Sequence, residues 1–120
     1  MTAIRREVLD NGLEIAFSDM SNRYYGDYHR VCVVATIGYA LAELPDDELR
    51  RQAIAVYGGQ FRVEKRLQRM AVPSADVESA RNALVDEFMR HAAAYLSRPD
   101  YPGLLVAAEL SRRRKSRFHA

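Results

Sequence analysis

The feature that most constrains the fold is an unbroken apolar run from Val31 to Ile37. Most of its side chains branch at Cβ, and such side chains fit the pleated surface of a strand. In a strand, one face would carry Val31, Val33, Ala35 and Ile37, and the other Cys32, Val34 and Thr36. A strand that is apolar on both faces is typical of the centre of a sheet. We therefore predict a central strand over residues 29–37, with helices on one face and a second cover, such as another subunit, on the other.

A hairpin is predicted before this strand. Ile4–Leu9 and Leu13–Phe17 are short runs joined by Asp10, Asn11 and Gly12. Asn-Gly between two such runs is typical of a type I′ turn, in which both central residues have positive φ. Alternate apolar residues in the second run predict a half-buried hairpin that leads into the central strand.

The segment between the hairpin and the central strand is polar and rich in tyrosine. It contains the candidate ligand or partner surface, made of Arg23, Tyr24, Tyr25, Asp27, His29 and Arg30, together with Tyr28. The acid, the imidazole and the guanidinium could serve acid–base or anion-binding chemistry, and the tyrosines could stack on a flat ligand. The alternative interpretation is an ordinary polar loop whose tyrosines close the end of the sheet.

These two segments together resemble a group of small uncharacterised bacterial proteins. The resemblance covers Leu9–Phe17 and Ser21–Val33, where an Asn-Gly hairpin is followed by a Ser/Asn/Arg segment, Gly-Asp and an apolar strand. No activity comes with this resemblance, so it implies a bacterial source and no mechanism.

Three helices are predicted after the central strand, over about 46–57, 75–96 and 104–115. Asp46 and the acids that follow it are typical of a helix start, and Gly58-Gly59 of its end. The second helix has an apolar stripe that includes His91, which we interpret as a core or interface histidine. Glu87 is the only acid or histidine three or four residues from His91, so a zinc site has little support.

Residues 60–72 fit two patterns. Phe61, Val63 and Leu67 alternate with polar residues as in a strand, whereas Val63, Leu67 and Met70 also share a helical spacing. We favour a strand over about 61–70, because two glycines precede it. Its charged outer row would oppose edge-to-edge pairing.

Length and composition indicate one domain over residues 1–120 that needs no disulfide or metal. The single cysteine, Cys32, lies within the apolar run and is interpreted as a small buried hydrophobe rather than a nucleophile. No segment approaches the ~18–20 apolar residues of a membrane span, and the N-terminus has no signal-peptide pattern. We expect a cytoplasmic protein with no membrane contact.

Positive charge is concentrated at the C-terminus. The net charge is +2, and five of the 18 basic residues follow Ser111, which leaves 13 against 16 acids before it. Residues 112–120 are therefore predicted to form a basic tail, with a candidate anion-binding set of Arg112, Arg113, Arg114 and Lys115. A solvated helix end is favoured over a nucleic-acid contact, because Phe118 is the only aromatic residue available for stacking.

The predicted fold class is α+β: an antiparallel sheet of about four strands with two or three helices packed mainly on one face. The chain has no phosphate-binding glycine loop, metalloprotease motif or nucleophile elbow. We expect no cofactor and no metal site. The favoured function is a non-enzymatic interaction or structural protein that forms a homodimer and can have another protein partner. The alternatives are a small-ligand or catalytic domain using Tyr24–Arg30, and nucleic-acid contact through the tail.

Overall fold

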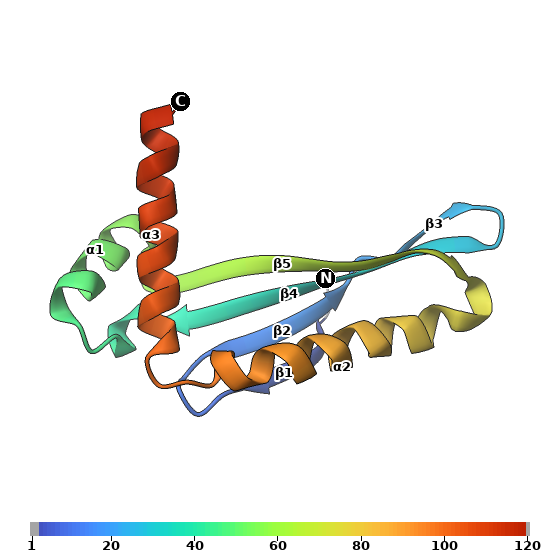
Figure 1. The fold of residues 1–120 in the computed structure, drawn as a ribbon, viewed down its shortest axis with the longest axis horizontal. Coiled ribbons are helices and arrows are strands. Elements are labelled where there is room, and N and C mark those ends of the chain that lie inside the picture. The colour runs from blue at the N-terminus through green and yellow to red at the C-terminus, as the bar shows by residue number, and fades with distance from the viewer. Residues whose placement is uncertain (1–2, 120) are drawn as a thin grey trace.

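The computed structural model describes residues 3–119, with side chains described up to Arg114. Within this range the chain forms a five-stranded antiparallel sheet and three α-helices, which confirms the predicted α+β class (Figure 1). The strands are β1 (Ala3–Val8), β2 (Glu14–Asp19), β3 (Asn22–Tyr25), β4 (Tyr28–Ala40) and β5 (Gln60–Pro73). The helices are α1 (Asp47–Tyr57), α2 (Val77–Leu96) and α3 (Tyr101–His119).

β4 is the centre of the sheet, as the apolar run predicted. It pairs with β5 along its length, from Tyr28 opposite Pro73 to Ala40 opposite Gln60. On its other edge, β2 pairs with residues 33–38 of β4, and β3 pairs with the first residues of β4. β1, β3 and β5 are therefore the strands with a free edge, and residues 31–35 and Ile37 of β4 are buried.

The hydrophobic core lies between the sheet and its helices, all of which pack on the same face of the sheet. The main cluster joins Ile15, Phe17 and Ile37 of the sheet to buried residues of α1, α2 and α3, namely Ala53, Val85, Ala92, Leu96, Val106 and Leu110. Phe17 meets Phe88 of α2 edge to face, with ring centroids 5.7 Å apart. Burial of each large aliphatic or aromatic side chain contributes about 1.5–3 kcal/mol, so this cluster holds the helices on one face.

The N-terminal hairpin forms where it was predicted, but the predicted type I′ turn is wrong. A type I′ turn needs positive φ at both Asn11 and Gly12. Gly12 has φ +93°, but Ala71 is the only non-glycine residue with positive φ in the described chain, so Asn11 does not meet this requirement. The amide of Gly12 donates to the carbonyl of Leu9 at 3.0 Å, and the amide of Leu9 to that of Leu13 at 2.8 Å. Asn11 is thus free to donate through Nδ2 to the carbonyls of Leu96 and Arg98, at 2.5 and 2.8 Å, and so cap the end of α2.

The polar segment predicted as a loop forms a second hairpin, made of β3 and the start of β4. Gly26 has φ +52° and Tyr25 pairs with Tyr28, so Gly26 and Asp27 form a two-residue turn. Glycine as the first residue of such a turn is typical of type II′, which matches the twist of the flanking strands. Gly26 and Asp27 are recognisable turn residues in the sequence, but the prediction placed them in a loop and not between two strands.

The remaining boundaries differ in detail. β4 extends to Ala40 and is followed by a 3₁₀ turn at Leu41–Glu43, and residues 60–72 lie in a strand, as we favoured. Asp46 caps α1 by accepting from the amide of Leu49 at 3.0 Å. α3 begins at Tyr101 rather than about 104, because Pro102 fits a first helical turn, where an N–H has no helical partner.

His91 is exposed, so the core alternative of its prediction is wrong, whereas the interface alternative stays a prediction. The apolar residues of α2 form two adjacent rows. The helix turns the row with Val85, Ala92 and Leu96 furthest into the core, which leaves His91 and Tyr95 outside.

Candidate interaction surfaces

All six residues of the predicted tyrosine-rich surface lie on one hairpin, residues 22–30, which we call the arm. Figure 1 shows the arm at the end of the molecule away from α1 and α3. Its strand β3 is exposed throughout, and the side chains of Tyr24, Tyr25 and Tyr28 are exposed, Tyr25 by 75%. The fold therefore brings the predicted residues together on a protruding surface.

The two arginines of the arm are bound to the arm itself. Arg23 donates through Nε to the carbonyl of Gly26 at 2.6 Å, and Arg30 through Nε to Oδ1 of Asn22 at 2.9 Å. The first contact ties β3 to the turn and the second joins the two strands, and each occupies one donor of a guanidinium.

His29 and Asp27 both contact Ser74, a residue that sequence reasoning did not nominate. Nε2 of His29 lies 2.9 Å from Oγ of Ser74, and the amide of Ser74 donates to the carbonyl of Asp27 at 3.1 Å. Hydrogen bonding to Ser74 is the main cause that lowers the pKa of the Asp27 carboxyl, followed by the charges of His29 and Arg23. The only sign in the sequence was Ser74 itself, at the start of the turn before α2.

A serine beside a histidine is half of a nucleophilic site, which also needs a group that orients the base and a pocket for the substrate. Among the described hydrogen bonds none joins His29 to an acid. A cavity of about 480 Å³ lies next to Ser74, lined by residues 69–73 and by Asp76 and Ser79, but neither His29 nor Ser74 lines it. The contact therefore fastens the arm to the turn before α2, and it gives the catalytic alternative no specific support.

The predicted basic tail continues helix α3, and its described arginines contact their own chain. Arg112 pairs with Glu109 at 2.5 Å, and the guanidinium of Arg113 lies over the ring of Tyr57, 5.3 Å from its centroid. The side chain of Lys115 lies outside the described residues.

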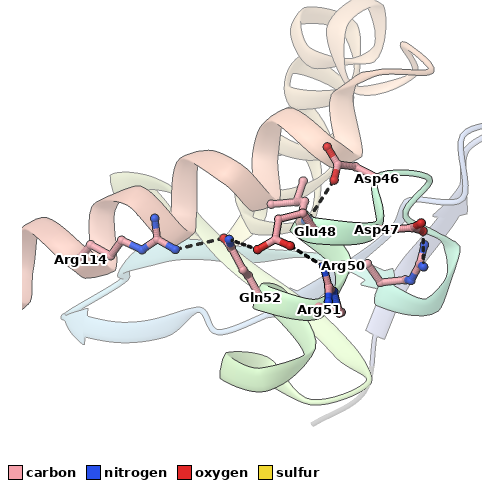
Figure 2. Close-up of polar contacts among 8 residues, drawn as sticks. Asp46, Asp47, Glu48, Arg50, Arg51, Gln52 and Arg114 are labelled. Carbon is pink, nitrogen blue, oxygen red and sulfur yellow. Dashed lines mark hydrogen bonds and ion pairs between the residues drawn. The ribbon is translucent and has the colours of Figure 1, made fainter.

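Arg114 links α3 to a polar network on α1 (Figure 2). Its Nη2 donates to Oε1 of Gln52 at 3.0 Å, and Nε2 of Gln52 donates to Oε1 of Glu48 at 2.9 Å. Glu48 in turn pairs with Arg51 at 2.5 Å. Arg113 and Arg114 therefore link α3 to α1, whereas Arg112 pairs within α3.

The face of the sheet opposite the helices, which we call the open face, has no covering helix among residues 3–119 (Figure 1). A depression of about 400 Å³ lies on it, with a floor of small residues that includes Ala16, Thr36 and Gly38. Arg6 and Glu14, paired at 2.6 Å, border one side, and Arg62 of β5 borders the other.

Cys32 lies in β4 on the open-face side and is buried, as predicted. Its amide donates to Oγ of Ser21 at 2.9 Å, which ties the arm's base to β4. Cys32 and Val34, which share this side of β4, are thus buried within the single chain.

The described residues contain no group of three or more His, Cys, Asp or Glu side chains placed to hold a metal ion. None of the helices, as far as they are described, is long and apolar enough to span a membrane. Comparison with protein families, curated protein sequences and solved structures finds no match.

Proposed function

We propose that this protein is a non-catalytic interaction protein that self-associates, with two copies joined through their open faces. The observation that carries the proposal is the one-sided arrangement of the sheet, in which the helices on residues 3–119 share one face and the depression lies on the other. A small domain that leaves a broad sheet face without a covering layer can bury it against a second copy.

The charges that border the depression support a symmetric contact. A two-fold axis parallel to the strands and lying between the copies would place the β5 side of one copy over the β1–β2 side of the other. Arg62 would then face Glu14 of the second copy, and Glu64 would face Arg6. Such an isologous arrangement repeats each opposite-charge contact twice, around a floor of small side chains that allows close approach.

Sedimentation velocity at micromolar concentration tests this proposal, and we expect a dimer. Thr36→Arg places a long charged side chain at the centre of the floor and is expected to give a monomer. Ala94→Arg, on the exposed surface of α2, is the matched control and should leave the dimer intact. A monomeric unmodified protein, or equal effects of the two substitutions, would contradict the proposal.

A further inference from the structure

The free edge of β5 has backbone groups that no described strand satisfies. The amide of Leu41 donates to the carbonyl of Gly59 at 3.1 Å, and residues 31–40 of β4 pair with residues 60–69 of β5 in the same register. In an antiparallel pair, hydrogen-bonded positions alternate along each strand. The backbone groups of the odd-numbered residues 61–67 therefore point toward β4, and those of Arg62, Glu64 and Arg66 point out of the sheet.

α3 reaches beyond this edge. Figure 1 shows α3 crossing the sheet near the start of β5, with its C-terminal half continuing past the edge of β5. The helical layer is thus wider than the sheet that it covers. A groove of about 510 Å³ lies between β5 and α3, where one more strand would find both a hydrogen-bonding edge and a helix above it.

The walls of this groove combine an apolar floor with a cationic rim. Its lining includes Tyr57, Phe61, Val63 and Leu105 as the apolar part. The rim has four cationic side chains, Arg62, Lys65, Arg112 and Arg113, against two acids, Glu64 and Glu109, which leaves a charge of +2. The groove therefore favours an acidic ligand that also has an apolar side chain.

One lining residue of the groove, Tyr57, has a hydroxyl that can donate a hydrogen bond. This hydroxyl is buried and has no hydrogen-bond partner among the described residues. Burial raises the pKa of this phenol, which keeps it protonated and able to donate to a carboxylate. A buried donor without a partner is destabilising, and a ligand acceptor that reached it would offset part of that cost.

We propose that the groove between β5 and α3 binds an extended acidic segment of another protein, which adds a strand to the free edge of β5. Main-chain hydrogen bonds to Arg62, Glu64 and Arg66 supply affinity, and side chains that alternate along the segment reach the apolar floor and the cationic rim. This site uses the edge and the helical side of β5, whereas the proposed dimer contact centres on the floor of the open face; Arg62 borders both, and Glu64, which lines the groove, also belongs to that dimer contact.

Charge argues against a second copy of β5 as the occupant. β5 contains four basic residues, Arg62, Lys65, Arg66 and Arg69, and one acid, Glu64, a net charge of +3. Two such strands side by side would bring like charges together beneath Arg112 and Arg113 of both copies, and like charges opposite each other in a sheet are destabilising. An acidic strand would instead bring opposite charges next to the basic residues of β5.

The probe is a short fluorescein-labelled peptide of alternating valine and glutamate, measured by anisotropy with the full chain. We expect saturable binding that weakens at least about tenfold with Lys65→Glu or Arg113→Glu. Arg90→Glu, an exposed charge reversal on α2, should leave the affinity unchanged. Each variant is compared with the unmodified protein by thermal unfolding, so that a loss of fold is not taken for a loss of binding.

Two further peptides separate strand addition from simple charge attraction. A peptide of the same sequence with alternate backbone nitrogens methylated cannot complete the ladder, and polyglutamate of equal length has no apolar side chain. Both should bind at least about tenfold more weakly than the probe. Equal binding by the three peptides, or no saturable binding of the probe up to about 1 mM, would overturn the proposal.

Hydrogen exchange locates the contact. The amides of Arg62, Glu64 and Arg66 should become protected when the probe binds, in the unmodified protein and in Thr36→Arg alike. Protection of these amides that rises with protein concentration alone would assign the edge to a second copy and overturn the proposal. Loss of probe binding in Thr36→Arg would place the site on the dimer face and would also overturn it.

Discussion

Asp19 and Arg81 form an ion pair, about three-quarters buried, that ties the end of β2 to α2. Their side chains meet at 3.1 Å, and the amide of Ser21 donates to the same carboxyl at 2.8 Å. Burial raises the pKa of Asp19, but the hydrogen bonds from Ser21 and Arg81 outweigh it and leave the pKa below its ordinary value of 3.8. The ionised form is thus the one that the folded state stabilises.

The stabilisation from Asp19 should therefore depend on pH. It is fully present above the unfolded-state pKa, near 3.8, and is lost as pH falls through the lower folded-state pKa. We expect Asp19→Asn to lower the melting temperature at pH 7 and to reduce the further loss on acidification. Thermal unfolding between neutral and acidic pH measures both effects, with Asp10→Asn, an exposed residue of the first hairpin, as the control. A parallel pH dependence in all three proteins would contradict the pKa assignment.

Ala71 occupies a backbone conformation that glycine adopts more easily. Its φ is +57°, at the irregularity where β5 has an additional residue opposite Arg30 of β4. A left-handed conformation costs a residue with a Cβ atom about 1–2 kcal/mol, partly offset by the greater freedom of glycine in the unfolded chain.

Ala71→Gly should consequently stabilise the protein by about 0.5–1 kcal/mol. The same exchange at Ala94, exposed in α2, should destabilise it by about 1 kcal/mol, because glycine weakens a helix. Urea unfolding of the two variants measures both changes. A destabilised Ala71→Gly would show that this bend in β5 does not store the expected strain.

At the scale of single elements, α3 is held to the fold mainly by its apolar side. Leu110 and Val106 are buried in the main core cluster, whereas Leu104 on the same helix is 55% exposed. The polar contacts of Arg112 and Arg114 lie at the surface, where each contributes about 0–1 kcal/mol. Apolar burial should therefore dominate the docking of α3.

Leu110→Ala should lower the free energy of unfolding by about 2–4 kcal/mol, because it removes a buried side chain and leaves a cavity. Leu104→Ala should change it by no more than about 0.5 kcal/mol. Chemical denaturation of both variants gives the comparison. Similar values for the two would mean that α3 is not packed through the face that contains Leu110.

The elements also differ in how well the sequence predicted them. β4 and the first hairpin followed from local patterns, the first from branched apolar residues and the second from Asn11-Gly12. β3 was missed because its four residues have exposed polar or aromatic side chains, so no hydrophobic alternation marked it as a strand. Gly26-Asp27 was present as a turn signal, but its meaning depended on β4 beginning at Tyr28.

At the scale of the whole molecule, the chain is elongated, with extents of 52 × 37 × 23 Å. The arm, the open face and the groove beside α3 are three separate surfaces of this shape (Figure 1). The predicted site residues on the arm came together, because a two-residue turn places them on neighbouring strands. The groove could not be predicted, since its lining comes from α1, β5 and α3 and no local pattern relates them.

The amino-acid sequence by itself determined the central strand, the helix on either side of β5 and the one-sided placement of apolar residues, because these depend on periodicity and on local capping. Tertiary structure alone decided which row of α2 enters the core, where the arginines of α3 lie, and that α3 extends past the edge of β5. Those features depend on how the helices pack against a twisted sheet around one hydrophobic core. Such packing is made by side chains that are far apart in the chain, so no local pattern specifies it.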